Sequence, residues 1–333
     1  MNGEEFAETA ARYIRFAEAE ARGRSALYEN FARCIADDRE LLGLLLELPK
    51  DKRQPNLLLA AVRHLFGTPG DWSRFRDLLA NDWEAVQAIM LEHSTQTNEP
   101  ARCAVLLPLL ARLPPPLALL EVGASAGLCL LPDLYAYDYG KRVLCPERWD
   151  RRAPLFHCRV NEETPLPTRM PDIVWRAGLD LNPIDVSDAA QARWLEALVW
   201  PEQTVRLANM RAAIKIAAAI KPRVVRADLR HDLASLVYEA PTDATLVIFH
   251  TAVLAYVPAV TDREDFARKV RTLCRYWISN EASQIFPDIA HRTTRCGAKG
   301  SFLLSVNGFP IAWTDPHGAS SEWISDVAFV LSS

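Results

Sequence analysis

The stretch LALLEVGASAGL, Leu117–Leu128, decides the fold expected for this chain of 333 residues. Its first six residues are mainly apolar and suit a strand buried in a parallel sheet. Small residues follow at Gly123, Ser125 and Gly127, and the apolar run LCLLPDLY is then expected to begin a helix. A buried strand, a tight turn of small residues and a helix make the first unit of a parallel α/β sheet.

The chain before this stretch is expected to be helical. Apolar residues recur there at spacings of three and four, as on one face of a helix. The first of them are Phe6, Ala10, Ile14 and Ala17, and further helices are expected at Glu40–Leu48, Pro55–Phe66, Trp72–Leu79 and Trp83–Glu92. Asn98 and Pro100 are typical of the cap and first turn of a last helix. The sequence therefore predicts an all-helical N-terminal region, residues 1–113.

Segments typical of strands and helices alternate after residue 128, which predicts a mostly parallel sheet covered by helices. The candidate strands are Ile173–Gly178, Arg223–Ala227, Thr245–Phe249 and Tyr276–Ser279, with a helix at Thr204–Ile220. Asn307-Gly308 predicts a C-terminal antiparallel hairpin, because Asn-Gly supplies the positive φ angles of a tight turn. We assign residues 114–333 to this sheet domain, with an insertion near residues 137–171.

Composition restricts the classes of partner. The net charge is −4 and no cluster of Lys and Arg marks a phosphate-backbone surface, so a nucleic-acid partner is not expected. The seven cysteines contain no C-x-x-C pair and the histidines no H-x-x-x-H pair, so we predict no metal and a reducing, cytoplasmic location. The longest apolar stretch, Thr245–Val260, is shorter than the roughly 20 residues of a membrane span, so we expect a soluble protein.

Four interpretations of Gly123, Ser125 and Gly127 are open. A loop for S-adenosylmethionine (SAM) needs small residues beside the ligand and the free N–H groups of a following helix. A dinucleotide loop would use G-x-G-x-x-G, in which Ser125 and Leu128 replace two glycines. In the nucleophile elbow of an α/β-hydrolase Ser125 would attack, with a later histidine such as His317, although the helical upstream region lacks the expected oxyanion loop. The fourth is a turn that binds nothing.

Several segments together resemble one family. They are TNEPAR (97–102), EVGASAGL (121–128), DLYAYDYG (133–140), RAGLDLNPIDV (176–186), VWPEQ (199–203), FHTAVLAYV (249–257), WISNE (277–281) and DPHG (315–318). In this order they resemble an uncharacterised bacterial family, domain of unknown function 2332, along nearly the whole chain. That family is similar to class I SAM-dependent methyltransferases, so the resemblance implies a Rossmann-like sheet of the methyltransferase type.

The resemblance also implies SAM as the cofactor and gives roles to individual residues. The acid-plus-glycine loop after the first strand corresponds to Glu121, Gly123, Ser125 and Gly127. A carboxylate at the end of the second strand holds the ribose diol, and Asp180 matches that position.

Asp228 is assigned in the same way, and Asp180 has two alternatives. Asp228, after the third strand, matches the acid that binds the adenine amine. Asp180 lies 57 residues (180 − 123) beyond Gly123, where about 20 is usual, so the insertion must separate them. If a strand lies within the insertion, Asp138 or Glu162 takes the ribose instead.

The remaining candidates concern the reaction. Arg102 either reaches the methionine carboxylate of the cofactor or makes a structural ion pair. His250 is a candidate general base, with a buried structural histidine as the alternative, and Tyr256 is placed to orient a substrate. The leading hypothesis is methyl transfer to a small molecule or a protein. The alternatives are a SAM-fold binding protein without turnover and a serine hydrolase that uses Ser125.

Overall fold

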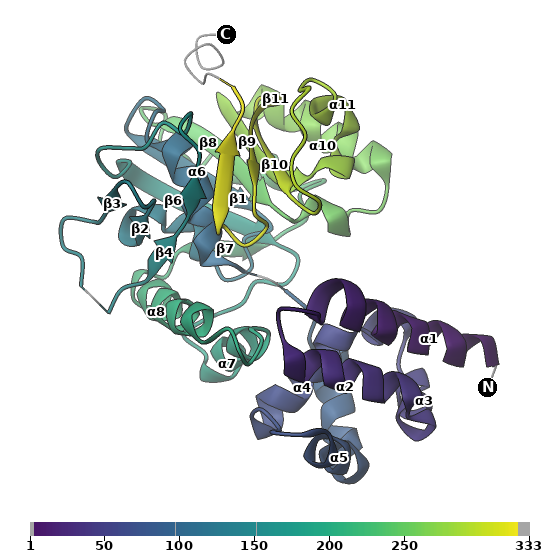
Figure 1. Cartoon of the computed structure of the whole chain (residues 1–333). Helices are drawn as coiled ribbons and strands as arrows, with labels where there is room; N and C mark the ends of the chain where they lie inside the picture. The colour runs from purple at the N-terminus through teal and green to yellow at the C-terminus, as the bar shows by residue number, and fades with distance from the viewer. Residues whose placement is uncertain (1–2, 97, 151, 326–333) are drawn as a thin grey trace. The chain divides into compact units, whose positions relative to one another are not determined.

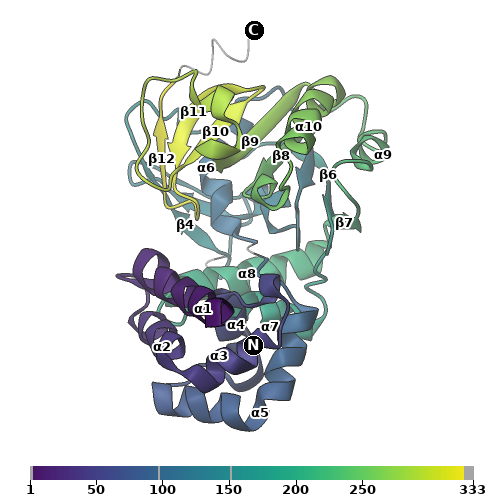
Figure 2. The same ribbon diagram turned by 90° about the vertical axis from the view of Figure 1, so that its right-hand side faces the viewer.

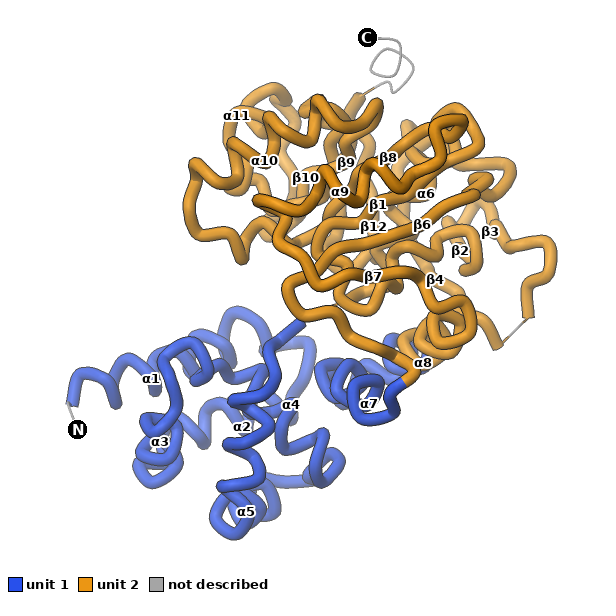
Figure 3. The backbone as a smooth tube through the Cα atoms, turned by 180° about the vertical axis from the view of Figure 1, so that it is seen from behind, with its two compact units in different colours: residues 1–97, 188–208 blue, residues 98–187, 209–333 orange. Residues whose placement is uncertain are grey.

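The structure is a computed structural model that describes residues 3–96, 98–150 and 152–325. The chain divides into two compact units, which Figure 3 draws in different colours. Unit 1 contains Met1–Thr97 and Asp188–Ala208, and unit 2 contains Asn98–Ser187 and Asn209–Ser333. The chain thus leaves unit 2 at residue 188, contributes residues 188–208 to unit 1 and returns to unit 2 at residue 209.

Unit 1 is helical, which confirms the predicted helical character of the N-terminal region. Its helices are α1 (Gly3–Phe16), α2 (Ala26–Asp37), α3 (Arg39–Leu46), α4 (Pro55–Phe66), α5 (Trp72–Glu92) and α7 (Ala189–Ala197) (Figure 1). The side chains of Ser25, Asp38 and Asp71 accept hydrogen bonds from the first turns of α2, α3 and α5. The two helices expected at Trp72–Leu79 and Trp83–Glu92 form one helix, which is kinked at Asp82.

Trp194 of α7 completes the core of unit 1. It is 1% exposed, stacks on His93 with 4.4 Å between ring centroids, and meets His64 edge-on at 5.8 Å. Burial lowers the pKa of both histidines. The charge of Arg193 lowers the pKa of His64 further, whereas the charge of Glu92 opposes the lowering at His93. The neutral imidazoles therefore suit this packing better than the charged ones.

The lowered pKa values predict that unit 1 loses stability in mild acid. The native state binds fewer protons at these histidines than the unfolded chain, so their contribution is complete above about pH 6.5 and is lost as the pH falls through the native pKa values. Denaturant unfolding of the whole chain, followed by tryptophan fluorescence at pH 7.5 and 5.5, should show a lower midpoint in acid. The His64→Gln/His93→Gln variant should show a smaller pH difference, and the exposed control His291→Gln the wild-type one.

Unit 2 is built on a nine-stranded sheet with the order β5-β12-β11-β10-β9-β8-β1-β6-β7. The strands are β1 (Leu117–Val122), β5 (Arg159–Val160), β6 (Ile173–Asp180), β7 (Arg223–Arg226), β8 (Thr245–Thr251), β9 (Tyr276–Ala282), β10 (Phe302–Val306), β11 (Phe309–Thr314) and β12 (Ser320–Trp323) (Figure 1). Strands β7-β6-β1-β8-β9 are parallel, and the pairs β9-β10, β10-β11 and β11-β12 are antiparallel. The short edge strand β5 pairs parallel with β12. The mostly parallel sheet is therefore confirmed, and the hairpin at Asn307-Gly308 is present, with φ of 50° and 81°.

Helices cover the sheet. They are α6 (Cys103–Leu110), α8 (Thr204–Ile220), α9 (Leu233–Val237), α10 (Val260–Leu273) and α11 (Pro287–Ala290). Leu233 of α9 and Phe266 of α10 share a core with Ile248 and Trp277 of the sheet. Figure 2 shows the ribbons of α9 and α10 together with the strands of this sheet. Every residue of α6 is buried, and α6 belongs to unit 2, so the units separate at residue 97 and not at the expected residue 113.

The insertion expected near residues 137–171 forms a small sheet of its own, β3-β2-β4. Its strands are β2 (Ala136–Asp138), β3 (Val143–Leu144) and β4 (Leu155–His157). The helix expected immediately after Gly127 is absent. Two 3₁₀ turns, Leu128–Leu130 and Pro132–Leu134, stand in its place. Pro132 explains the correction, because it lacks an N–H and disfavours helical geometry at Leu131, whose φ is −117°.

Candidate functional site

The candidate site lies where the connections from β1 diverge. Strand β1 pairs with β6 on one side and with β8 on the other, so consecutive parallel strands lie on opposite sides of it. In open α/β sheets ligands bind at this point, beyond the carboxyl ends of the strands. The loop Gly123–Gly127, which we call the glycine loop, occupies this position.

The glycine loop is tied to the end of β6. The N–H groups of Gly123 and Ala124 donate to the Leu179 carbonyl at 2.9 and 3.1 Å. The Ser125 N–H donates to Asp180 Oδ2 at 2.8 Å, and Ser125 O accepts from the Ile184 N–H at 3.1 Å. The loop N–H groups that would otherwise receive an anion are thus partly used within the protein. Ligand recognition at this loop must come mainly from side chains.

Close packing explains why small residues are needed here. A Cβ on Gly123, whose φ is 75°, would lie 2.3 Å from Val253 Cγ2. A Cβ on Gly178 of β6 would lie 2.4 Å from the Ala124 Cβ. Val253, after β8, and Gly178, within β6, therefore both pack closely against the glycine loop. Val253 determines how closely a ligand can approach Gly123.

Asn98 holds the glycine loop from the opposite side. Its Nδ2 donates to Ala124 O and its Oδ1 accepts from the Leu128 N–H, both at 3.1 Å, with the side chain buried. The expected helix cap at Asn98 is instead made by Glu99, which accepts from the Ala101 N–H. The reason is that a 3₁₀ turn, Pro100–Arg102, precedes α6 and moves the cap by one residue. Thr97, the first residue of the TNEPAR segment, lies outside the described residues.

An acidic and a basic side chain, Glu121 and Arg102, are buried beside this loop. Glu121, on β1, is 2% exposed, and its Oε2 has no hydrogen-bond partner among the described residues. Burial raises the pKa of Glu121 well above its usual range, and the neighbouring Arg102 opposes this rise. A buried acid with a raised pKa at the carboxyl end of a parallel strand is a candidate functional group.

Arg102 is 5% exposed and is held by oxygen atoms of the chain. Its Nε donates to Pro316 O at 2.8 Å, and its Nη1 donates to Thr251 O and Oγ1 at 3.2 and 3.3 Å. Within the described ranges no carboxylate lies within 4 Å of this guanidinium. A buried arginine positioned by neutral oxygens keeps its charge available for an anionic ligand.

The other acidic candidates follow the ends of neighbouring strands. Asp180 ends β6 beside Arg226 of β7, and its Oδ1 accepts from the Asn182 N–H at 2.8 Å. Asp228 follows β7 and pairs with Arg230 at 2.6 Å, and hydrogen bonds from Arg230 lower the pKa of Asp228. Glu121 and Asp180 thus lie at the carboxyl ends of β1 and β6, and Asp228 lies just beyond the end of β7, so the three acids belong to three adjacent parallel strands.

The two alternatives for the ribose acid lie away from this edge. Asp138 ends β2 in the small sheet, where it contacts His157 at 3.0 Å and accepts from the Gly140 N–H. Glu162 forms an ion pair with Lys141 on the surface. Strand β2 therefore belongs to the small sheet, and β5, the strand of the insertion that joins the main sheet, pairs with β12 at the end of the strand order farthest from β6 and β7. Among these three carboxylates only Asp180 lies at the glycine loop.

His250 is fully buried at the end of β8. Its Nδ1 lies 2.7 Å from Glu281 Oε1, and its Nε2 accepts from the Trp277 indole N–H at 3.0 Å. These partners assign the proton to Nδ1 and use both ring nitrogens. Glu281 Oε1 also accepts from the N–H groups of Val253 and Leu254. The Glu281 carboxylate therefore fixes the segment after β8, which packs on Gly123 through Val253.

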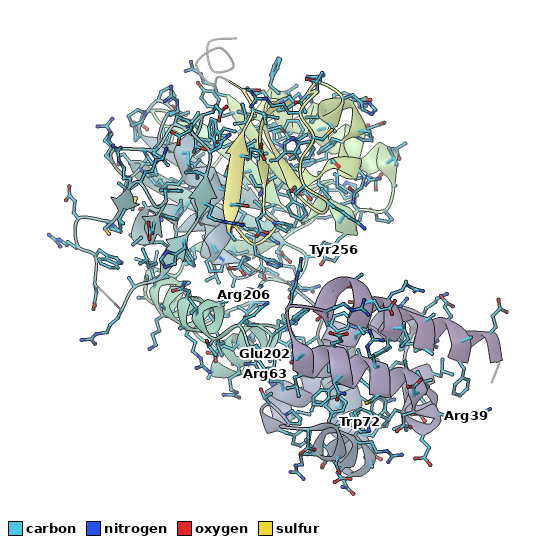
Figure 4. All side chains as sticks on the ribbon, in the orientation of Figure 1. Arg39, Arg63, Trp72, Glu202, Arg206 and Tyr256 are labelled. Carbon is cyan, nitrogen blue, oxygen red and sulfur yellow. The ribbon has the colours of Figure 1, made fainter. Side chains whose placement is uncertain are left out.

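Tyr256 and Ser125 differ strongly in exposure. Tyr256 ends the 3₁₀ turn Leu254–Tyr256 and is 71% exposed (Figure 4). Ser125 has a φ of 50°, a strained value that a nucleophile elbow shares. Its Oγ is buried, however, and has no hydrogen-bond partner in the part of the chain that the structure describes. A serine nucleophile needs a hydrogen-bonded base, and this geometry provides none.

Sequence reasoning missed several polar residues of the site. Asn280 of β9 is fully buried, and its Oδ1 accepts from Thr314 Oγ1 at 2.8 Å. Its Nδ2 has no partner among the described residues. The hydrogen bonds of Thr251 with Arg102 and of Asn98 with the glycine loop were equally unexpected. The one signal for Thr251 and Asn280 in the sequence is a polar residue near the end of an apolar strand, which is too common to be specific. Asn98 has only the signal of a helix cap.

The residues that the structure describes contain no group of three or more His, Cys, Asp or Glu side chains that could hold a metal ion. Across the same three ranges, no helix has both the length and the apolar character that crossing a membrane requires.

Fold and site together define an α/β protein with a large, mostly parallel sheet, a glycine loop at its switch point and a helical unit. The family model described as "Uncharacterized protein conserved in bacteria (DUF2332)" matches residues 10–323. The chain therefore belongs to this family, as its sequence segments predicted. No curated protein and no solved structure matches the chain.

Proposed function

We propose that this protein binds SAM over the glycine loop and transfers the methyl group to a small molecule or a protein. The observation that carries the proposal is the pair Glu121 and Arg102. Both are buried beside the loop, and neither has an ion-pair partner within 4 Å among the described residues. The methionine end of SAM carries one ammonium and one carboxylate, so it can satisfy an acid and a guanidinium in one binding event.

The strand-end carboxylates suit the adenosyl end. Asp180 accepts hydrogen bonds from the N–H groups of Ser125 and Asn182, and each carboxylate oxygen can accept more than one hydrogen bond. It can therefore hold the loop and also accept from a ribose diol. Asp228 would accept from the adenine amine and share its charge with Arg230. The orphaned Glu121 Oε2 and Ser125 Oγ, both buried, are the polar atoms that a ligand at this loop would satisfy.

The residues of the chain would supply binding and orientation. Bound SAM provides an electrophilic methyl group on sulfur. Arg102, Glu121 and Asp180 would fix the two ends of the cofactor, and the segment after β8, held by Glu281, would border the acceptor side. Positioning of this kind can lower a reaction barrier by several kcal/mol without covalent participation of the protein.

We expect SAM and S-adenosylhomocysteine to raise the melting temperature. Ligand at about 100 times its Kd should add ~2.7 kcal/mol to the unfolding free energy. Asp180→Asn should weaken binding by about tenfold or more in calorimetry, because its amide nitrogen cannot accept from a diol hydroxyl. The control is Asp243→Asn, an exposed residue before β8 at the opposite edge of the sheet, which should bind like the wild type.

Two outcomes would decide against this function. Absence of any shift with millimolar ligand would exclude both the methyltransferase and the binding protein without turnover. Binding without transfer of labelled methyl groups to any component of a bacterial extract would leave the binding protein. Labelling of Ser125 by a fluorophosphonate would favour the hydrolase instead.

A further inference from the structure

The turn Asp315–Gly318 lies directly on the turn Pro100–Arg102, although more than 200 residues of sequence separate them. Arg102 Nε donates to Pro316 O at 2.8 Å. A Cβ on Gly318, whose φ is 83°, would lie 2.0 Å from Ala101 O, so only glycine allows this approach. Asp315 Oδ1 accepts from the His317 N–H at 2.8 Å, which fixes the turn that carries His317.

This contact places a histidine beside a buried acid. His317 Nδ1 lies 3.8 Å from Glu99 Oε2. The His317 side chain is 43% exposed, whereas that of Glu99 is 2% exposed. A buried carboxylate facing Nδ1 orients an imidazole and stabilises its protonated form, while the exposed part of the ring can reach a substrate. Such contacts are often long without substrate and shorten when it binds.

The same turn is tied to the glycine loop. Asn98, next to Glu99, holds Ala124 O and the Leu128 N–H, and Glu99 O lies 3.3 Å from Cys129 Sγ. His317 is therefore positioned by residues that also position the proposed cofactor loop. His250, in contrast, is fully buried with both ring nitrogens occupied, so a substrate proton cannot reach it in this arrangement.

We propose that His317 is the proton acceptor of the reaction and that Glu99 is its positioning residue, an inference that rests on the proposed function. The nucleophile X–H forms the X–CH₃ bond as the S–CH₃ bond of SAM breaks. The bonding electrons stay on sulfur, which leaves a neutral thioether, and the X–H proton moves to His317. The methyl acceptor is thus a hydroxyl, thiol or amine that must lose a proton, not a nucleophile that is already an anion.

The first test needs no methyl acceptor. In the full chain saturated with S-adenosylhomocysteine, the imidazole resonance of His317, assigned with His317→Gln, is titrated by NMR. Glu99→Gln removes the carboxylate charge but keeps an acceptor for the Ala101 N–H, so the titration midpoint of His317 should fall. An unchanged midpoint would overturn the pairing. The matched control is Glu264→Gln, an exposed residue of α10, which should leave the midpoint in place.

The second test measures transfer of labelled methyl groups to the extract component that accepts them. His317→Gln should bind S-adenosylhomocysteine within twofold of the wild type but react about 100-fold more slowly or worse. The wild-type rate should rise with pH as His317 loses its proton, and the variant should lack this rise. His291→Gln should behave as the wild type. Wild-type rate and pH profile in His317→Gln would refute the inference. If the wild type does not bind S-adenosylhomocysteine, the proposed function itself is refuted. Failure of the role of His317 is therefore distinguishable from failure of the proposed function.

Discussion

Gly178→Ala is expected to destabilise unit 2 by about 2–3 kcal/mol and to displace the glycine loop, because overpacking a filled interior costs this much. The added methyl group would lie 2.4 Å from the Ala124 Cβ and 3.3 Å from the Glu121 carbonyl oxygen. The backbone of Gly178 itself tolerates alanine, since its φ is not positive. Denaturant unfolding measures the loss, and calorimetry with SAM measures the displaced loop as weaker binding.

Two further variants isolate the cause. Ala124→Gly removes the atom that Gly178→Ala strikes, so the double variant should recover more than half of the loss as a coupling energy. Gly43→Ala, in α3 with open space around it, should stabilise unit 1 by about 0.5–1 kcal/mol through helix propensity. If Gly178→Ala is as stable as the wild type, the close packing of β6 against the glycine loop is refuted.

Glu121→Gln should stabilise the fold increasingly as the pH rises. Burial raises the native pKa of Glu121, so native Glu121 keeps its proton where the unfolded chain, with a pKa of about 4.3, has lost it. The contribution of protonated Glu121 to the stability of the wild type is therefore complete below about pH 4.3. Above that pH the contribution falls by about 1.4 kcal/mol per pH unit, until the native pKa is reached. The glutamine variant lacks this loss, so its stability relative to the wild type should increase as the pH rises above about 4.3.

The same substitution should weaken binding of SAM. A neutral amide replaces the carboxylate proposed to receive the ammonium group, and a hydrogen bond to a charged group is worth about 1.5–3 kcal/mol, or at least a tenfold loss of affinity. Opposite signs for stability and affinity identify a ligand site, since a purely structural residue loses both together. A Glu121→Gln variant that is less stable than the wild type at pH 7, or that binds SAM equally well, would contradict this role.

The elements were predictable wherever short-range pattern decides them. The strands β6 and β8 lie within a few residues of their expected bounds, because each is a short, mainly apolar run of the kind that a largely buried strand requires. The helix expected after Gly127 failed because Pro132 interrupts it and because the side chains of Tyr135 and Tyr137 donate to the carbonyls of Leu128 and Pro132. These contacts stabilise a compact turn that local helix propensity does not anticipate.

The candidate site was predictable only in part. The positions of Glu121 and Asp180 at strand ends followed from the strand pattern. That Asp180 accepts a hydrogen bond from the Ser125 N–H, and that His250 is enclosed by Glu281 and Trp277, depends on which strands are neighbours. The pairing of His317 with Glu99 joins the two ends of the sheet unit and has no local signal.

The amino-acid sequence by itself determined the alternation of strands and helices, the need for small residues after β1 and the absence of a metal motif, because each is a property of neighbouring residues. The tertiary structure alone decided that residues 188–208 belong with the N-terminal helices and that Arg102 meets Thr251 and Pro316. Contacts between distant segments arise when separate apolar faces are buried together, and no spacing along the chain encodes which polar groups that burial brings into contact.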